Sequence, residues 1–389
     1  MRARITLAAL AATTLLVLTG CVANSPDAAA GTVTVTSSAD ACAVSTDTAT
    51  AGATSFSVTN SGTQVTEFYL LASDRLRIMG EVETVGPGIT RTLVVQLPTG
   101  DYFTACKPGM VGDGVGTAPF TVSANTSAGA DATGDADLTA QVDTANRNYA
   151  SYVRDQIAQL VAGTDAFAAA YRAGDDDTAR SLYASTRAHW ERVETVAESF
   201  GDLDPKLDLR EADLEEGQDW TGWHAIEKDL WPADAEPGFT AYPPAERDRL
   251  AGLLVTDTAS LNDNVQNLSF TLAQQTNGAI GLLDEVASGK VTGEEEFWSH
   301  TDLWDFQANV DGAAVLYAGV RDLLISQDPK LTDTLDAEFT ALQQLLNAQR
   351  VGDGFTLYTD LEPAAIRALA DQVNALGEPL NRLTAALVL

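Results

Sequence analysis

The spacing of apolar and polar residues changes once along this chain and divides it into two parts. From Gly31 to Ser123, apolar residues alternate with Thr, Ser and other polar residues in short runs such as Thr32–Thr36 and Thr90–Leu97. Gly, Pro and Asn separate the runs. Alternation with a period of two predicts β-strands that are buried on one face. We therefore expect a small β-sandwich over residues 32–123.

Helical spacing begins after residue 136 and continues to the C-terminus. Residues 124–136 are small, polar or acidic, which predicts a flexible linker. Beyond them apolar residues recur every three or four positions, which predicts an all-α bundle domain over residues 137–389. The expected helices are Asp137–Arg172, Asp175–Phe200, Asp213–Leu230, Ala245–Ser288, Gly293–Ser326, Pro329–Gln349 and Glu362–Leu389.

The first twenty residues have the order of a targeting signal. Two arginines precede an apolar stretch that ends in Leu18-Thr-Gly-Cys21. This order predicts a bacterial lipoprotein signal peptide over 1–20, with lipid on Cys21 and a tether over 21–31. Ordinary secretory cleavage nearby is the alternative. We expect a protein outside the cytoplasm, anchored to the cell membrane by lipid, in the periplasm or the cell-wall space.

The chain is strongly acidic, with 55 Asp and Glu against 23 Lys and Arg and a formal net charge of −32. A surface of this sign repels nucleic acid, which excludes a nucleic-acid-binding function, and it attracts cations. When charge is taken alone, adaptation to solubility or salt is the better explanation.

One short motif offers metal ligands in a chain that has only three histidines. In Gly222-Trp-His-Ala-Ile-Glu227, the residues His224 and Glu227 are three positions apart and would share one face of a helix. An imidazole nitrogen and a carboxylate on one face supply part of a metal shell. A core histidine satisfied by ordinary hydrogen bonds is the alternative.

Two further helical segments carry acids next to tryptophan. Glu191 and Glu194 are three residues apart, and so are Asp302 and Asp305. Carboxylates on several facing helices, together with one imidazole, form an oxygen-rich site for a hard cation. Solvated acidic faces are the alternative, because the chain is rich in acids throughout.

These blocks resemble a known family. Residues Ser199–Trp231 and Ser299–Asp311 look like the imelysin-type domain of EfeO proteins, and the likeness extends over residues 137–389. It implies a pair of helical bundles with a metal site between them, built around Gly222, His224 and Glu227. It also implies that residues 32–123 are a cupredoxin-like domain. The acids that would complete the shell are Glu191, Glu194, Asp302 and Asp305.

The resemblance implies a function in metal transport. EfeO proteins are extracytoplasmic components of a bacterial iron-uptake system, so the chain would capture ferric or ferrous iron and deliver it to an iron permease in the membrane. A haem peroxidase would be a further partner, and zinc or copper are alternative metals.

Two other functions compete with iron capture. A zinc metallopeptidase of imelysin type is the first, although zinc peptidases use a second histidine near the first and residue 228 is lysine. A structural surface adhesin without metal is the second.

The predicted sandwich contains Cys42 and Cys106, which allow two interpretations. Outside the cytoplasm an even pair of cysteines predicts a disulfide, which we prefer. The resemblance implies instead a second metal site made of both cysteines with Glu67 and Glu81. The two exclude each other, because oxidised sulfur offers no thiolate. A blue-copper centre is excluded, since no histidine precedes His189.

Overall fold

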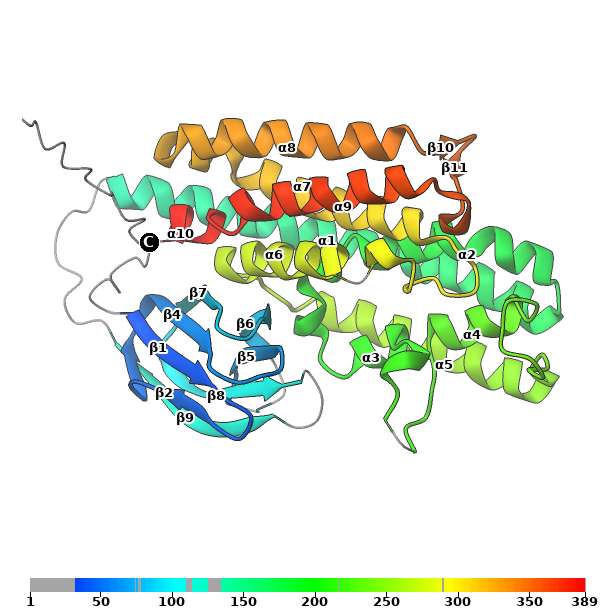
Figure 1. Ribbon diagram of the computed structural model, residues 1–389, viewed down its shortest axis with the longest axis horizontal. Coiled ribbons are helices and arrows are strands. Elements are labelled where there is room, and N and C mark those ends of the chain that lie inside the picture. Colours follow the sequence, from blue (N-terminus) through cyan, green and yellow to red (C-terminus); the bar gives the residue numbers. More distant parts are fainter. Residues whose placement is uncertain are drawn as a thin grey trace, which may run out of the picture.

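The structure, a computed structural model, describes residues 32–388 except 74, 76–77, 110–113, 125–133, 216 and 289. A β-sandwich lies against one end of a larger helical domain (Figure 1). The predicted fold class, a β-sandwich followed by an all-α domain, is confirmed. The predicted signal peptide, the tether and Cys21 lie outside the described residues, and so does most of the predicted linker. Nowhere in the described part is a helix both long and apolar enough to cross a bilayer.

The alternating Thr and Val residues of the N-terminal part form two sheets that face each other. One sheet has the order β2-β1-β4-β7 and the other has the order β3-β9-β8-β5-β6. β1 is parallel to β4 and β3 to β9, and the other neighbours are antiparallel. The strands are β1 (Thr32–Ser37), β2 (Cys42–Val44), β3 (Thr48–Thr50), β4 (Gly52–Asn60), β5 (Thr66–Leu71), β6 (Ile78–Val85), β7 (Thr90–Leu97), β8 (Gly100–Pro108) and β9 (Val115–Ser123).

Aromatic residues and one disulfide hold the two sheets together. The ring centroid of Phe56 lies 5.3 Å from that of Phe68 and 5.4 Å from that of Phe120, and all three side chains are buried. Removing these rings from water is the main stabilising contribution of the sandwich core. Cys42 in β2 and Cys106 in β8 form a disulfide, which links one sheet to the other.

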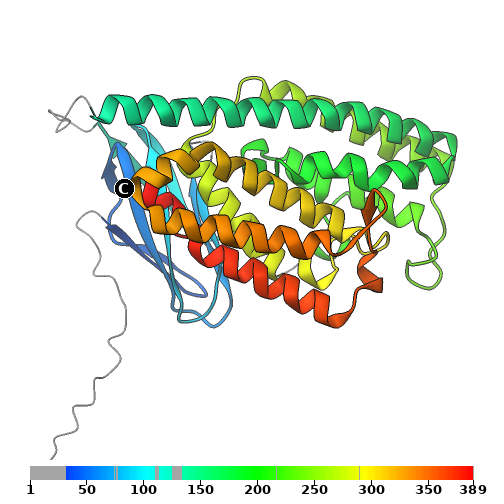
Figure 2. The same cartoon turned by 90° about the horizontal axis from the view of Figure 1, so that it is seen from above.

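The helical domain contains two groups of helices that meet along α2 and α7. α1, α2 and α5 pack together, α6, α7, α8 and α9 pack together, and α1 runs the length of the domain (Figure 2). The helices are α1 (Gly134–Ala173), α2 (Asp176–Glu191), α3 (Leu203–Asp208), α4 (Trp223–Leu230), α5 (Pro244–Val265), α6 (Leu272–Ser288), α7 (Asp302–Gln327), α8 (Pro329–Asn347), α9 (Pro363–Leu380) and α10 (Leu383–Val388). Short elements are the 3₁₀ helices η1 (Glu194–Phe200), η2 (Glu211–Asp213), η3 (Lys290–Thr292) and η4 (Tyr358–Asp360), and the hairpin β10 (Arg350–Val351) and β11 (Gly354–Phe355).

Five predicted helices were too long, and one of these errors concerns the histidine motif. The segment expected to be helical from Asp213 becomes regular only at Trp223, because Gly222 has a φ of +86°. A Cβ atom at Gly222 would lie 2.2 Å from the main-chain oxygen of Leu207. This glycine therefore turns the chain tightly against the end of α3 and starts α4 there.

The other four long predictions end early, divide in two or start late. The predicted helix Asp175–Phe200 is α-helical only to Glu191, and Gly293–Ser326 starts at Asp302. Ala245–Ser288 is divided into α5 and α6, and Glu362–Leu389 into α9 and α10. Residues 293–301 form turns because the N–H groups of Trp298 and Ser299 donate to Glu227 Oε1, at 2.9 and 2.7 Å, instead of to helical carbonyls.

The sandwich contacts the helical domain through β6 and β7, which face α6 and α10. Arg91 in β7 forms an ion pair with Asp284 in α6, and the Asn277 amide donates to the Val94 carbonyl at 2.5 Å. A cavity of about 740 Å³ lies between these elements, and Glu81 is the only predicted site residue that lines it.

We expect Gly222→Ala to lower the free energy of unfolding by more than about 1 kcal/mol, since the new Cβ meets the Leu207 oxygen in a left-handed conformation. Gly174→Ala is the matched control, because Gly174 has a φ of +72° with no atom within 4 Å of its Cβ position. Urea denaturation of both variants measures the difference. Equal losses would show that close packing at Gly222 does not matter.

Candidate metal centre

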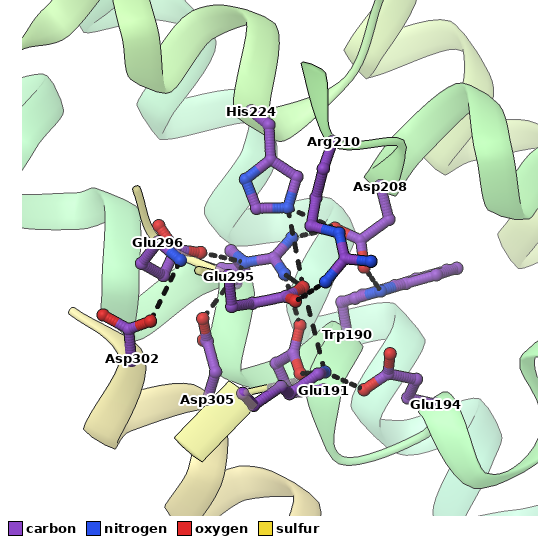
Figure 3. Close-up of polar contacts among 12 residues, drawn as sticks. Trp190, Glu191, Glu194, Asp208, Arg210, His224, Glu295, Glu296, Asp302 and Asp305 are labelled. Atoms are coloured by element: carbon purple, nitrogen blue, oxygen red, sulfur yellow. Dashed lines mark hydrogen bonds and ion pairs between the residues drawn. The ribbon is translucent and has the colours of Figure 1, made fainter. Parts of the chain in front are cut away.

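Eight carboxyl groups converge where the two groups of helices meet, and all of their residues except Glu227 are labelled in Figure 3. They come from α2, η1, α3, α4, the turns before α7, and α7 itself. Six of them belong to fully buried residues, and the side chains of Asp208 and Glu194 are 9% and 13% exposed. We call this set the acidic cluster: Glu191, Glu194, Asp208, Glu227, Glu295, Glu296, Asp302 and Asp305.

Arg187 occupies the middle of the acidic cluster, and its guanidinium is completely buried. Its nitrogens lie 2.6 Å from Glu191, 3.0 Å from Glu295 and 3.4 Å from Asp305. It also forms ion pairs with Asp208 and Glu296. The planar guanidinium, with five N–H donors, suits this number of carboxylate partners.

Basic side chains do not balance the acids of the cluster. The buried Lys290 ammonium lies 2.9 Å from Glu191 and 2.7 Å from Glu194, and Arg210 reaches Glu295 at 3.2 Å. With Arg187 these are three cations against eight carboxyl groups, which leaves five carboxyl groups unmatched among the described residues. Buried unmatched charge is unfavourable, so protons or a metal ion must supply the missing positive charge.

His224 lies among the acids with one nitrogen unsatisfied. Its Nδ1 atom is 3.1 Å from Glu227 Oε2, so the two residues share a face of α4. Its Nε2 atom is 3.4 Å from Asp208 Oδ1 and 3.7 Å from Glu295 Oε1, but has no hydrogen-bond partner. Imidazole and carboxylate atoms grouped in this way fit the ligand set of a cation.

Other atoms of the cluster are either fixed by the backbone or left without a partner. Glu227 Oε1 accepts two main-chain N–H groups, and Asp302 Oδ1 accepts the N–H of Glu296 at 3.2 Å. These bonds orient both carboxylates. The second oxygen of Asp302 and Oδ1 of Asp305 are buried without a hydrogen-bond partner in the described part of the chain. Buried oxygens of this kind need a proton or a cation.

Local charges shift the pKa values of Asp208, Glu295 and His224. Burial alone would raise the pKa of Asp208, but the Arg187 guanidinium and His224 lower it to about 2. Burial is likewise outweighed at Glu295, where Lys290 and His224 hold the pKa well below its usual range. Burial and Arg187 oppose protonation of His224, yet the neighbouring carboxylates of Asp208, Glu227 and Glu295 raise its pKa well above the usual value. The surrounding acids therefore favour the protonated imidazole in the metal-free centre.

Four other acids of the cluster hold protons more tightly than usual. Burial raises the pKa of Glu227 and of Asp302 to about 7, with repulsion from Glu296 as the next cause in both. Burial also raises the pKa of Asp305 and Glu194 well above the usual range. Protonation of these groups near neutral pH reduces the excess negative charge of the metal-free cluster.

Five of the six ligands predicted for the helical domain belong to the acidic cluster and the sixth, His224, lies among them, but the six do not surround one point. His224 and Glu227 are in contact, whereas Glu194 lies against Lys290. Asp305 is paired with Arg187, and Asp302 is bonded to the backbone of Glu296. Glu191 has both Arg187 and Lys290 as partners.

The sequence patterns did not indicate several members of the site, namely Arg187, Asp208, Lys290, Glu295 and Glu296. Two of the three groups of potential ligand atoms that lie within 4.8 Å of one another contain His224, and both include at least one of these acids. A signal was present for two of them, because the run Glu294-Glu-Glu296 directly precedes the Trp298 block. Arg187 and Lys290 gave none, since a basic residue normally predicts an exposed position.

The second site suggested in the sandwich is not assembled. Cys106 is the cross-strand partner of Phe68, whereas Glu67 and Tyr69 alternate with Phe68 and face the other side of β5. Glu81 pairs with Tyr69 and lies on that side as well. The disulfide thus lies on the inner face of the sheet, and both acids lie on the opposite face.

Comparison with known proteins agrees with this architecture. The sequence profile of the imelysin family, which carries a peptidase name, matches residues 145–383. The chain therefore belongs to the imelysin family. Its relatives include proteins named iron uptake system component EfeO. That of Yersinia pestis is 37% identical over 339 residues, and that of Escherichia coli is 34% identical over 345 residues. Each match covers 86% of both chains.

A solved structure extends the likeness to the fold. It is described as an iron-regulated protein A precursor from Parabacteroides distasonis, and it is 16% identical to this chain with a TM-score of 0.51. The match covers 67% of this chain and 97% of that one. At this identity the likeness concerns the fold alone.

We expect Arg187→Met to lower the stability of the metal-free protein by about 3–5 kcal/mol or to abolish cooperative unfolding, because it leaves several buried carboxylates unpaired. Arg321→Met is the matched control. Its ion pair with Asp336 is partly exposed, so its loss should lower the stability by less than about 1 kcal/mol. Guanidinium denaturation after chelator treatment tests this, and similar values for the two variants would contradict it.

Proposed function

We propose that this protein is an iron-binding component of a bacterial iron-uptake system, and that the acidic cluster is its iron site. The observation that carries the proposal is the unsatisfied Nε2 atom of His224, which faces the carboxylates of Asp208 and Glu295 inside a cluster with too few cations. The printed names of the relatives support the same role.

The chemistry of the cluster suits iron as cargo. Carboxylate oxygens favour a hard ion such as ferric iron, and one imidazole keeps ferrous iron, zinc and copper as further candidates. Asp208, His224 and Glu295 would be the first ligands, with Glu227, Glu191, Glu194, Asp302 and Asp305 around them. Asp208 and Glu194 are the most exposed members, so they mark the side from which an ion would enter.

The proposed setting is the cell envelope. Residues 1–20 would be a lipoprotein signal peptide and Cys21 the lipidated residue, which would place the protein outside the cytoplasm on the membrane surface. Residues 32–123 and 137–389 would act as two domains joined by a linker. The partners would be a membrane iron permease, which receives the ion, and a haem peroxidase of the same system. The net charge of −32 would concentrate cations around the protein.

A zinc metallopeptidase is the second candidate, suggested by the name of the family profile. It would need a zinc shell from one histidine and acids, because none of the ligand groups formed by the described residues contains His189 or His300. His224 is only 1% exposed, so the peptide bond of a substrate would have to approach a residue that is almost inaccessible to solvent. These features favour binding over peptide hydrolysis.

We expect His224→Ala to weaken iron binding more than about tenfold, since it removes one ligand of the proposed shell. The measurement is calorimetric titration of the chain truncated before Cys21 with citrate-buffered ferric iron, with ferrous iron under anaerobic conditions, and with zinc. His300→Ala is the control, because it retains the cluster. Absence of binding for every metal by the unsubstituted chain would overturn the proposed function.

We expect the affinity for ferrous iron to fall as the pH is lowered from 8 to 6. His224 is protonated without metal, and Glu227 and Asp302, with pKa values of about 7, gain protons across this range. Binding must displace these protons, so each proton released lowers the affinity about tenfold per pH unit. Calorimetry in two buffers of different ionisation enthalpy counts the protons. A pH-independent affinity with no proton release would show that these groups do not ligate the ion.

A further inference from the structure

The ammonium group of Lys290 is buried among carboxylates of the acidic cluster. Its side chain is 1% exposed, and its ammonium nitrogen lies 2.9 Å from Glu191 Oε2 and 2.7 Å from Glu194 Oε2. Glu295 Oε1 lies 3.8 Å away. Three carboxylates from separate segments thus surround one buried ammonium group.

Two of these carboxylates belong to a further ligand group. Oxygens of Glu191, Glu194 and Asp208 lie within 4.8 Å of one another, and this group shares only Asp208 with the groups that contain His224. The amide of Asn309 also points there, donating to Glu191 Oε2 at 2.9 Å and to Glu194 Oε2 at 2.8 Å. The Oδ1 atom of this buried amide has no hydrogen-bond partner among the described residues. Turning the amide over would present that oxygen to a cation.

We propose that Lys290 is a tethered counter-ion that fills a second cation position beside the iron site and restricts the acidic cluster to a single metal ion. This inference rests on the proposed function and specifies its stoichiometry. Paired carboxylates at such distances are the usual ligands of two-metal centres. A covalently attached ammonium fills one of the two positions permanently, and only the position beside His224 exchanges its ion.

Glu295 connects the two positions. Its Oε1 atom is 3.7 Å from His224 Nε2 and 3.8 Å from the Lys290 nitrogen. The lysine charge is therefore close enough to repel a second ion and to limit the total charge that the cluster accepts. Replacement of Lys290 by a neutral residue should free the second position without removing any proposed ligand.

The test is the number of metal ions bound by Lys290→Met in the otherwise intact chain. Methionine has an unbranched side chain that is one atom shorter than that of lysine, and it carries no charge. We expect the unsubstituted protein to bind one Mn²⁺ or one ferrous ion after equilibrium dialysis, and Lys290→Met to bind two. Electron paramagnetic resonance of the Mn²⁺ form should show two interacting ions in the variant and an isolated ion in the parent. Lys206→Met is the control, since Lys206 forms an exposed ion pair with Asp202.

The outcomes separate this inference from the proposed function. No metal bound by the unsubstituted protein would overturn both. One ion bound by both proteins, or two ions bound by the unsubstituted protein, would overturn the role of Lys290 and leave the iron site intact.

If Lys290→Met does not fold without metal, refolding in the presence of Mn²⁺ provides the decisive measurement. A cation that replaces the ammonium should restore a cooperative thermal transition, with two ions bound. Lys290→Gln, which keeps a polar side chain between Glu191 and Glu194, should give the same stoichiometry. Failure of Mn²⁺ and of ferrous iron to restore folding of both variants would contradict the inference.

Discussion

The ion pairs of Arg187 are the interaction on which the arrangement of the helical domain depends. One guanidinium, fully buried, joins carboxylates from α2, α3, the turns before α7, and α7. None of these charges can move into water without separation of the packed helices, and none can be buried alone without a large loss of stability. The two groups of helices therefore meet with their polar side chains in one fixed arrangement, which also defines the ligand positions around His224.

The shortage of cations in this arrangement links stability to function. When no metal is bound, the raised pKa values of Glu227, Asp302 and His224 favour protons on these three groups. A bound ion would replace those protons and satisfy the same atoms, so the cluster can exchange one kind of positive charge for the other with its framework unchanged.

The sequence predicts some parts of this site better than others. Three-residue spacing brings His224 and Glu227 together because both lie on one regular helix. Spacing does not predict the position of Glu295, because the turns before α7 are not helical. Their main-chain N–H groups donate to Glu227, which is distant in the sequence. Alternation predicts the strands of the sandwich, but only the pairing of β5 with β8 shows that Glu67 faces away from Cys106. Long-range pairing, which no local pattern contains, decides these positions.

One hydrogen bond gives the site an optical property. The indole N–H of Trp190 donates to Asp208 Oδ2 at 2.7 Å, while the other oxygen of that carboxylate faces His224. Only the Asp208 carboxylate would separate an ion bound there from the buried indole of Trp190, which is a fluorophore. Iron quenches indole emission efficiently at such short range, whereas zinc, with its filled d shell, does not. The natural fluorescence of the chain would then distinguish the two metals without any attached label.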